Sequence, residues 1–266
     1  MSLRITVRGH GPARLAWLHG LFGQGRNFNT VAGMLDEAAT SLLIDLPNHG
    51  RSSWTDRFDY DLFADLVAIE LRSGYADSRP VVLLGHSMGG KIAMRLALRH
   101  PELIQGLVVI DIAPIARQET TEFANYIDAL LDLDLASLPD RRAADEILRT
   151  AIPNPTTRAF LLQNLDRESA GGWRWLANLP LLRAGLARLA GWPETNDQWA
   201  GPVLWLVGQQ SDFVSRQAEP AMRRYFPETH LVEIPDAGHW VHADQPRAVA
   251  AAIAGFLARL ESQDRR

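Results

Sequence analysis

Short runs of apolar residues, many of them β-branched, recur along the chain between clusters of turn-forming residues. They occupy residues 5–7, 15–18, 42–44, 81–84, 107–112, 203–207 and 231–234. Short apolar runs bounded by glycine, proline, asparagine and aspartate are typical of strands inside a sheet. We therefore interpret all seven runs as buried β-strands.

Between several of these runs, apolar residues recur at the three-to-four-residue spacing of an amphipathic helix. One such pattern comprises Leu62, Phe63, Leu66, Val67 and Ile69, and another comprises Val249, Ile253, Phe256, Leu257 and Leu260. Near-continuously apolar strands that alternate with amphipathic helices are typical of parallel sheets. The pattern predicts an α/β fold in which a mostly parallel central sheet has helices on both faces.

The alternation of strands and helices stops after Pro114 and resumes close to residue 200. The intervening sequence has apolar residues at helical spacing, and it shows no strand pattern. We predict a core made of residues 1–113 and 200–266, interrupted by a helical cap, or lid, over residues 114–199. An insertion between two strands of one sheet lies at the edge where open α/β folds bind ligands.

The predicted cap is rich in large apolar side chains. They include Trp173, Trp175, Trp192, Leu130, Leu161, Leu165, Leu176 and Leu182. We expect most of them to pack within the protein and some of them to line an acyl pocket.

Composition excludes several functional classes. The 266 residues are 47% hydrophobic and 22% charged, which is typical of a globular protein. The absence of cysteine excludes disulfides, thiolate nucleophiles and cysteine-ligated metals. The 27 basic and 31 acidic residues give a net charge of −4, and the basic residues are scattered, so we expect no nucleic-acid partner. Nothing in the sequence indicates a metal or an organic cofactor.

No apolar run approaches the roughly 18–20 residues that span a bilayer, so we expect no stable membrane insertion. Residues 1–7 lack a basic head followed by an apolar stretch, and they enter a strand pattern at once. We therefore expect no signal peptide and a cytoplasmic location. The sequence leaves the oligomeric state open.

The clearest chemical motif follows the run at 81–84. The sequence Gly85-His86-Ser87-Met88-Gly89 has the form Gly-x-Ser-x-Gly, and helical spacing begins directly after it. A serine on a sharp turn between a strand and a helix has its hydroxyl held above the sheet, close to free N–H groups at the start of the helix. We predict that Ser87 is a nucleophile.

A serine hydroxyl needs a base to accept its proton, and at neutral pH that base is most often an oriented histidine. The chain has eight histidines. His239 follows the last predicted strand and precedes the C-terminal helix, which places it at the same sheet edge as Ser87. We predict that His239 is the base, and we expect His86 inside the turn and His242 at the surface.

The negative charge that forms on an attacked carbonyl oxygen needs two backbone N–H donors. Met88, directly after the serine, can supply one of them. The other is expected from the loop after the strand at 15–18, where glycines let the chain fold back toward the site. We predict that Leu21 supplies this second N–H.

Several segments together resemble the α/β-hydrolase fold superfamily over the whole chain: His19-Gly20-Leu21, Asp45-Leu46-Pro47-Asn48-His49-Gly50-Arg51-Ser52, residues 85–90 and Gly238-His239-Trp240. Residues 48–52, 89–94 and 109–114 are similar to the small YbfF-like esterases. The resemblance implies activity on short-chain carboxylic esters and on some acyl-CoA thioesters. Many relatives have glycine at the position of Asn48, and asparagine tolerates the left-handed conformation of such a turn.

The acidic member of the site is open between two aspartates. Most members of the superfamily place it three residues beyond a glycine after the penultimate core strand, but here that residue is Ser211, and Asp212 comes one residue late. In an extended chain a shift of one residue reverses the direction of the side chain, so Asp212 would point the other way. Asp111 ends the strand after Ser87, where some branches, including the YbfF-like esterases, carry their acid. We favour Asp111 as the carboxylate that orients His239.

The leading hypothesis is a cofactor-free serine hydrolase that cleaves a small-molecule ester or thioester through an acyl-enzyme. A second hypothesis keeps the same residues but changes the bond, to carbon–carbon cleavage, amide hydrolysis or peroxyacid formation. A third is a small-molecule-binding relative without turnover. Dehalogenases and epoxide hydrolases of the superfamily use an aspartate nucleophile, so Ser87 argues against both.

Overall fold

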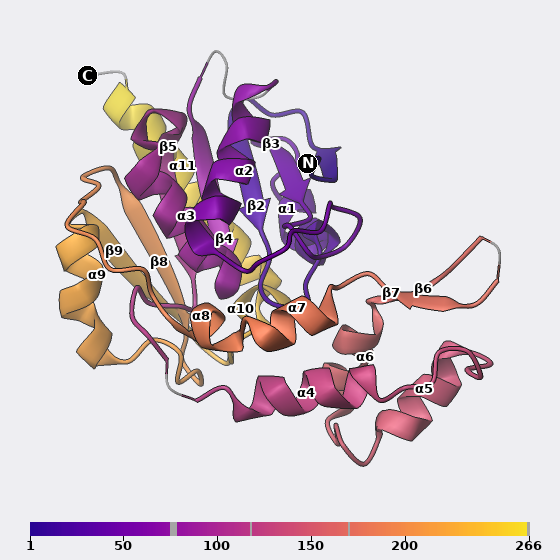
Figure 1. The fold of residues 1–266 in the computed structure, drawn as a ribbon. Coiled ribbons are helices and arrows are strands. Elements are labelled where there is room, and N and C mark those ends of the chain that lie inside the picture. The colour runs from indigo at the N-terminus through magenta and orange to yellow at the C-terminus, as the bar shows by residue number, and fades with distance from the viewer. Residues whose placement is uncertain (75–78, 118, 170, 265–266) are drawn as a thin grey trace.

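The computed structural model describes residues 1–74, 79–117, 119–169 and 171–264. Its centre is a seven-stranded sheet of order β1-β3-β2-β4-β5-β8-β9 (Figure 1). Strand β1 runs antiparallel to β3, and every other neighbouring pair in this sheet is parallel. The strands are β1 (Ile5–Arg8), β2 (Ala13–Leu18), β3 (Ala39–Ile44), β4 (Val81–His86), β5 (Ile104–Ile110), β8 (Val203–Gly208) and β9 (Thr229–Ile234). The predicted fold class is confirmed.

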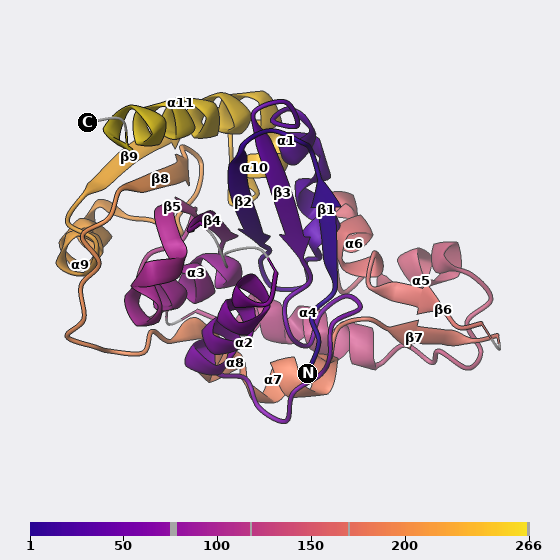
Figure 2. The ribbon, with the colours of Figure 1, turned by 90° about the horizontal axis from the view of Figure 1, so that it is seen from above.

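Helices cover both faces of this sheet (Figure 2). One face carries α2 (Tyr60–Arg72), α3 (Met88–Arg99) and α9 (Glu219–Tyr225), and the other carries α1 (Asn29–Gly33), α10 (Val241–Asp244) and α11 (Pro246–Asp264). Successive residues of a strand point to opposite faces, and accordingly Leu83 belongs to the first core whereas Leu84 belongs to the second. Both cores are apolar, which explains why the central strands lack a polar alternation.

The two edge strands differ from the prediction that all seven are buried. Val7 in β1 is 57% exposed and Leu231 in β9 is 42% exposed. Each edge strand has only one neighbour in the sheet, so helices need not cover it as they cover the centre. The apolar runs identified these strands correctly, but they did not reveal their place in the sheet.

The chain between β5 and β8 leaves the central sheet and runs along one end of it (Figure 1). It forms α4 (Thr121–Leu131), α5 (Arg141–Leu148), α6 (Pro155–Leu162), β6 (Leu165–Arg167), β7 (Trp173–Trp175), α7 (Leu179–Ala184) and α8 (Leu186–Ala190). The antiparallel pair β6–β7 corrects the expectation that this segment contains no strand. Strands this short carry too few residues to establish a two-residue period.

Candidate functional site

Ser87 occupies the turn between β4 and α3, at the carboxyl end of the parallel strands. Its backbone has φ 52° and ψ −120°, a conformation that non-glycine residues rarely adopt and that is typical of strained functional turns. Its N–H donates to the Ile110 carbonyl at 3.0 Å, which fixes the turn to the end of β5. The hydroxyl therefore projects from a rigid position rather than from a mobile loop.

The glycines on either side of Ser87 permit close backbone packing. A Cβ atom on Gly85 would lie 2.3 Å from the Gly89 carbonyl oxygen, and one on Gly89 would lie 2.3 Å from the Leu18 carbonyl oxygen. Neither position has room for a side chain. The motif spacing is thus a packing requirement of a helix that starts directly against two strands.

His239 lies in the loop after β9, and its ring connects two of the predicted residues. Its Nε2 lies 3.0 Å from the Ser87 Oγ, and its Nδ1 lies 2.8 Å from the Asp111 Oδ2. An ionised carboxylate only accepts hydrogen bonds, so Nδ1 carries the proton and the Nε2 lone pair faces the serine hydroxyl. This is the tautomer that a general base for Ser87 needs.

Asp111, at the end of β5, is fully buried, whereas the side chain of Asp212 is 82% exposed. Oδ1 of Asp111 accepts the Gly208 N–H at 3.0 Å, and Oδ2 accepts the Ser211 hydroxyl as well as the His239 ring N–H. These donors stabilise the charged form of a carboxylate that water does not reach. Asp212 instead contacts Arg117, with 3.2 Å between Oδ2 and the guanidinium. The geometry therefore favours Asp111.

Two backbone N–H groups beside Ser87 have no hydrogen-bond partner among the described residues. In the described part of the chain, the N–H groups of Leu21 and Met88 donate to no other group. Both residues are buried, and together with Ser87 they line one hollow. Buried N–H groups are normally paired, so two free ones beside a nucleophile suit an oxyanion that forms during reaction.

Two small hollows lie beside Ser87, which lines both of them. Leu21 and Phe123 line both of them, and Phe123 comes from α4. The first hollow is mainly aromatic and is lined by residues that include Phe22, Tyr126, Phe160 and Trp240. The second is lined in part by the charged side chains of Lys91, Arg117 and Glu119.

Most of the large side chains singled out between residues 114 and 199 lie away from the two hollows beside Ser87. Of the three tryptophans and five leucines singled out in the sequence, Leu161 alone lines either hollow beside Ser87. Trp173, Trp175 and Leu176 line a separate groove, while Trp192 packs against Tyr225 with 5.5 Å between ring centroids. Large side chains follow the packing of the short cap helices, which periodicity does not determine.

Sequence reasoning missed further residues that hold His239. The Phe213 ring stacks on the His239 ring with 3.5 Å between centroids, and Arg117 lies 3.7 Å from the Phe213 centroid. From the turn before Ser87, His86 Nε2–H donates to the His239 carbonyl at 2.8 Å. His242, expected at the surface, is 7% exposed because α10 turns its ring inward to within 4.7 Å of the His86 ring centroid.

Four buried histidines make the stability of the fold sensitive to acid. Burial lowers the pKa of His19 to about 4, lowers those of His49 and His242 to about 3, and lowers the pKa of His86 well below its usual value. The unfolded chain takes up these protons near pH 6.5, whereas the folded chain does not. Their contribution to stability is therefore complete above about pH 6.5 and is lost as the pH falls toward 4.

We expect His19, His49 and His242 each to lower the free energy of unfolding by up to about 2 kcal/mol at pH 5. Urea unfolding at a series of pH values measures the slope of the unfolding free energy against pH. His49→Gln should make the slope shallower by up to one proton, whereas His10→Gln, at a ring that is 70% exposed, should leave it unchanged. Equal slopes of the unfolding free energy against pH in wild-type protein and His49→Gln would contradict the lowered pKa of His49.

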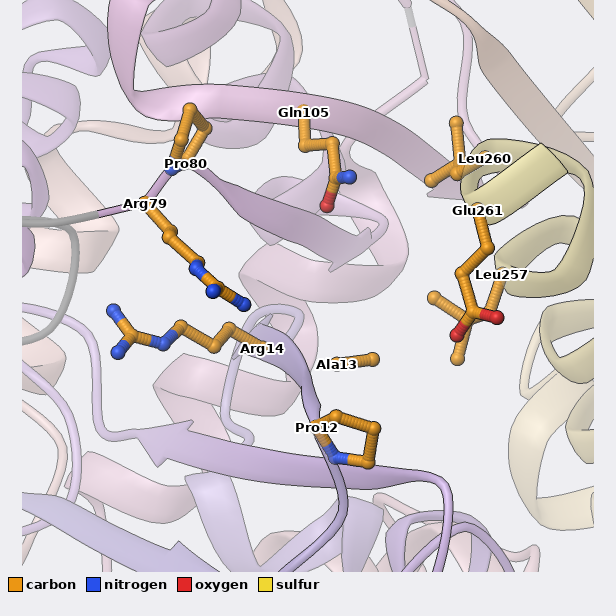
Figure 3. A pocket seen from close by; sticks show the side chains of 9 residues that line it. All are labelled: Pro12, Ala13, Arg14, Arg79, Pro80, Gln105, Leu257, Leu260 and Glu261. Carbon is orange, nitrogen blue, oxygen red and sulfur yellow. The ribbon is translucent and has the colours of Figure 1, made fainter. Parts of the chain in front are cut away.

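Another hollow, with an empty volume of about 950 Å³, lies at the opposite end of the sheet (Figure 3). It is lined by the starts of β2 and β4 and by α11, and Arg14, Arg79 and Glu261 border it. Open α/β folds bind ligands at the carboxyl ends of their strands, and this hollow is at the amino ends. Ser87 and His239 lie at the carboxyl ends, so the candidate site is the one beside Ser87.

Within the described ranges, no group of three or more histidine, aspartate or glutamate side chains is arranged to hold a metal ion. Among the described helices, none combines the length and the apolar character needed to cross a membrane.

The left-handed residue predicted in the early turn is present, because Asn48 has a φ of 66°. Its side chain spans that turn, with Nδ2 donating to the Thr55 hydroxyl at 2.7 Å and Oδ1 accepting the Thr55 N–H at 2.9 Å. The turn also reaches α7, since the Asn48 carbonyl accepts the Asn178 N–H. Asparagine thus replaces glycine here and ties the core to the inserted segment.

Comparison with known proteins agrees with this geometry. Residues 15–252 match the model of the alpha/beta hydrolase family. The chain is 37% identical to the sn-1-specific diacylglycerol lipase ABHD11 of Danio rerio, over 91% of this chain and 78% of that protein. It is 32% identical to the esterase YbfF of Escherichia coli, over 93% and 94% of the two chains. A solved marine microorganism esterase is 32% identical and superposes with a TM-score of 0.92, over 96% of this chain and 98% of that chain. The chain therefore belongs to the α/β hydrolase family.

Proposed function

We propose that the protein is a serine hydrolase that cleaves carboxylic esters, with Ser87, His239 and Asp111 as its catalytic residues. One observation carries the proposal: a continuous line of hydrogen-bond contacts from the Asp111 carboxylate through the His239 ring to the Ser87 hydroxyl. The names of the similar proteins, two esterases and a lipase, point to the same bond class.

Acylation starts when the Ser87 Oγ attacks the ester carbonyl carbon while His239 Nε2 accepts the hydroxyl proton. The charge that forms on the carbonyl oxygen is stabilised by the N–H groups of Leu21 and Met88. Asp111 keeps the His239 ring oriented and stabilises its positive charge. The carbon–oxygen bond then breaks, and His239 returns the proton to the leaving alcohol.

Deacylation repeats these steps with water as the nucleophile. His239 accepts a proton from water, the hydroxide attacks the acyl-serine, and the proton passes to the Ser87 Oγ as the acid leaves. A thioester follows the same course with a thiol as the leaving group. This cycle needs no metal or organic cofactor.

We infer that residues 114–199 form a cap over the reaction centre. Phe123 in α4 and Phe160 in α6 line the aromatic hollow beside Ser87, and Leu189 in α8 lines the other hollow. Apolar walls of this kind suit the short hydrocarbon groups of an ester, and they lower the dielectric around the charges that form in the reaction.

Turnover of a p-nitrophenyl ester series, from acetate to octanoate, run beside acyl-CoA thioesters, tests the proposal. A serine esterase gives linear release of many equivalents of p-nitrophenol from at least the short esters. Release of a single equivalent followed by silence would indicate a binding protein and would contradict the proposal.

A further inference from the structure

Lys91 is the single lysine of the chain, and it lies one helical turn after Ser87. It is 2% exposed and lines the second of the two hollows beside the serine, the one that also includes Arg117 and Glu119. Its Nζ donates to the carbonyls of Ala190 and Gly191 at 2.9 and 2.7 Å, at the end of α8. These two bonds aim the ammonium group and leave one of its three N–H groups for another acceptor.

The ammonium group has no acidic partner in the described part of the chain, where no carboxylate oxygen lies within 4.0 Å of Nζ. Its charged neighbours in the hollow are Arg117 and Glu119. The Arg117 guanidinium adds positive charge, and the Glu119 carboxylate is exposed and accepts the Thr121 N–H at 2.7 Å. Tyr60, from α2, contributes its ring, 5.8 Å from Nζ, while its hydroxyl donates to the Leu189 carbonyl.

A buried cation without a counter-charge is costly, and burying it costs least where a ligand supplies the missing charge. The hollow that contains Lys91 opens onto the nucleophile and both predicted oxyanion donors. An anionic group bound beside Nζ would therefore be part of the same molecule as the ester whose carbonyl lies at Ser87.

We propose that Lys91 forms an anion subsite for esters that carry a free carboxylate a few atoms from the ester carbonyl, such as half-esters of short dicarboxylic acids. The inference rests on the proposed function and names a substrate class for it. The carboxylate accepts the remaining N–H of Lys91, and the reacting carbonyl meets Ser87 as in any other ester. The aromatic hollow then takes the alcohol part.

The test compares monomethyl succinate, glutarate and adipate with the matching methyl esters that end in an amide. Methanol release gives kcat/KM for each pair, and the ratio within a pair cancels differences in folded enzyme and in the chemical step. We expect at least one acid to exceed its amide by about tenfold to a hundredfold in wild-type protein, the value of a hydrogen bond to a charged group. Lys91→Met should remove this preference.

Arg223→Met is the matched control, because it also removes one positive charge but at an exposed ion pair with Glu219 on α9. It should leave the acid-to-amide ratio within about twofold of wild type, consistent with the small value of exposed ion pairs.

Wild-type protein supplies an independent readout that needs no variant. Burial, together with the charge of Arg117, lowers the pKa of Lys91 to about 7. The ammonium form is present below that pH, so the acid-to-amide ratio of kcat/KM should fall as the pH rises through 7. Any effect of pH on the chemical step is common to both esters of a pair and cancels in the ratio.

Equal ratios in wild-type protein and Lys91→Met, or a ratio in wild-type protein that does not change with pH, would overturn the subsite. That result, obtained with active enzyme, would mean that Lys91 only anchors α8. If the protein hydrolyses none of the esters, charged or neutral, that result would contradict the proposed function itself and the subsite with it.

Discussion

Ser87→Ala is expected to lower kcat/KM for a short ester by at least about 10³-fold, as is typical when a serine nucleophile is removed. Alanine leaves His239 without a proton to accept, and it leaves no oxygen that can form the acyl-enzyme. The free N–H groups of Leu21 and Met88 still stabilise attack by water, which accounts for the residual rate. Steady-state hydrolysis of p-nitrophenyl butyrate measures the loss.

Ser262→Ala is the matched control, since that serine lies on the exposed side of α11 and donates to the Arg259 carbonyl within its own helix. It should retain wild-type activity and show that the loss in Ser87→Ala comes from that position and not from exchanging a serine or from the preparation. Full activity in Ser87→Ala would end the proposed mechanism.

Asp111→Asn is expected to lower kcat by about 10⁴-fold, the loss seen when the corresponding carboxylate of a serine protease becomes an amide. The amide can donate to His239 Nδ1, which favours the tautomer with its proton on Nε2. That ring cannot accept the Ser87 proton, and nothing opposes the positive charge that forms on it. Steady-state and single-turnover kinetics on the same ester separate this effect from any change in binding.

Asp212→Asn supplies the comparison, because Asp212 is the alternative acid, one residue beyond the position where most members of the superfamily carry theirs. The side chain is exposed and contacts Arg117 rather than His239, so we expect less than about a threefold change, in line with an exposed ion pair. A severe loss in Asp212→Asn together with a mild one in Asp111→Asn would refute the choice of Asp111.

The central fold is predictable from sequence because its strands and its helices each satisfy a simple requirement. The central strands must be apolar on both faces, and helices such as α2 and α11 need one apolar side. Neither requirement depends on residues far away in the chain. The hairpin β6–β7 escapes this reasoning because three residues per strand cannot establish a period, and Gly171 and Gly172, with φ of 90° and 96°, read equally well as a break between helices.

The positions of the three proposed catalytic residues were predictable for a topological reason. Ser87, Asp111 and His239 all follow strands that run parallel, so their loops converge at one edge of the sheet whatever the details of packing. The spacing that pointed to Ser211 also has a physical basis, since that residue reaches the same carboxylate and donates to it. Sequence position alone could not show whether the residue in this loop is the carboxylate itself or a side chain that donates a hydrogen bond to it.

The pocket was not predictable, because its walls depend on contacts between distant segments. Phe123 and Phe160 reach Ser87 through the packing of short helices, and the burial of Lys91 depends on the carbonyls of Ala190 and Gly191. The inward turn of His242 likewise requires space beside Phe28 and His86. Side-chain direction in these places follows tertiary contacts rather than local pattern.

The most direct test of the account is covalent labelling with a fluorophosphonate, read out by mass spectrometry of the intact protein and of its peptides. An activated serine displaces fluoride and gains one phosphonyl group, so the account predicts one adduct per chain, on the peptide that contains Ser87, and none in Ser87→Ala. An unlabelled wild-type protein, or an adduct on a different serine, would contradict it.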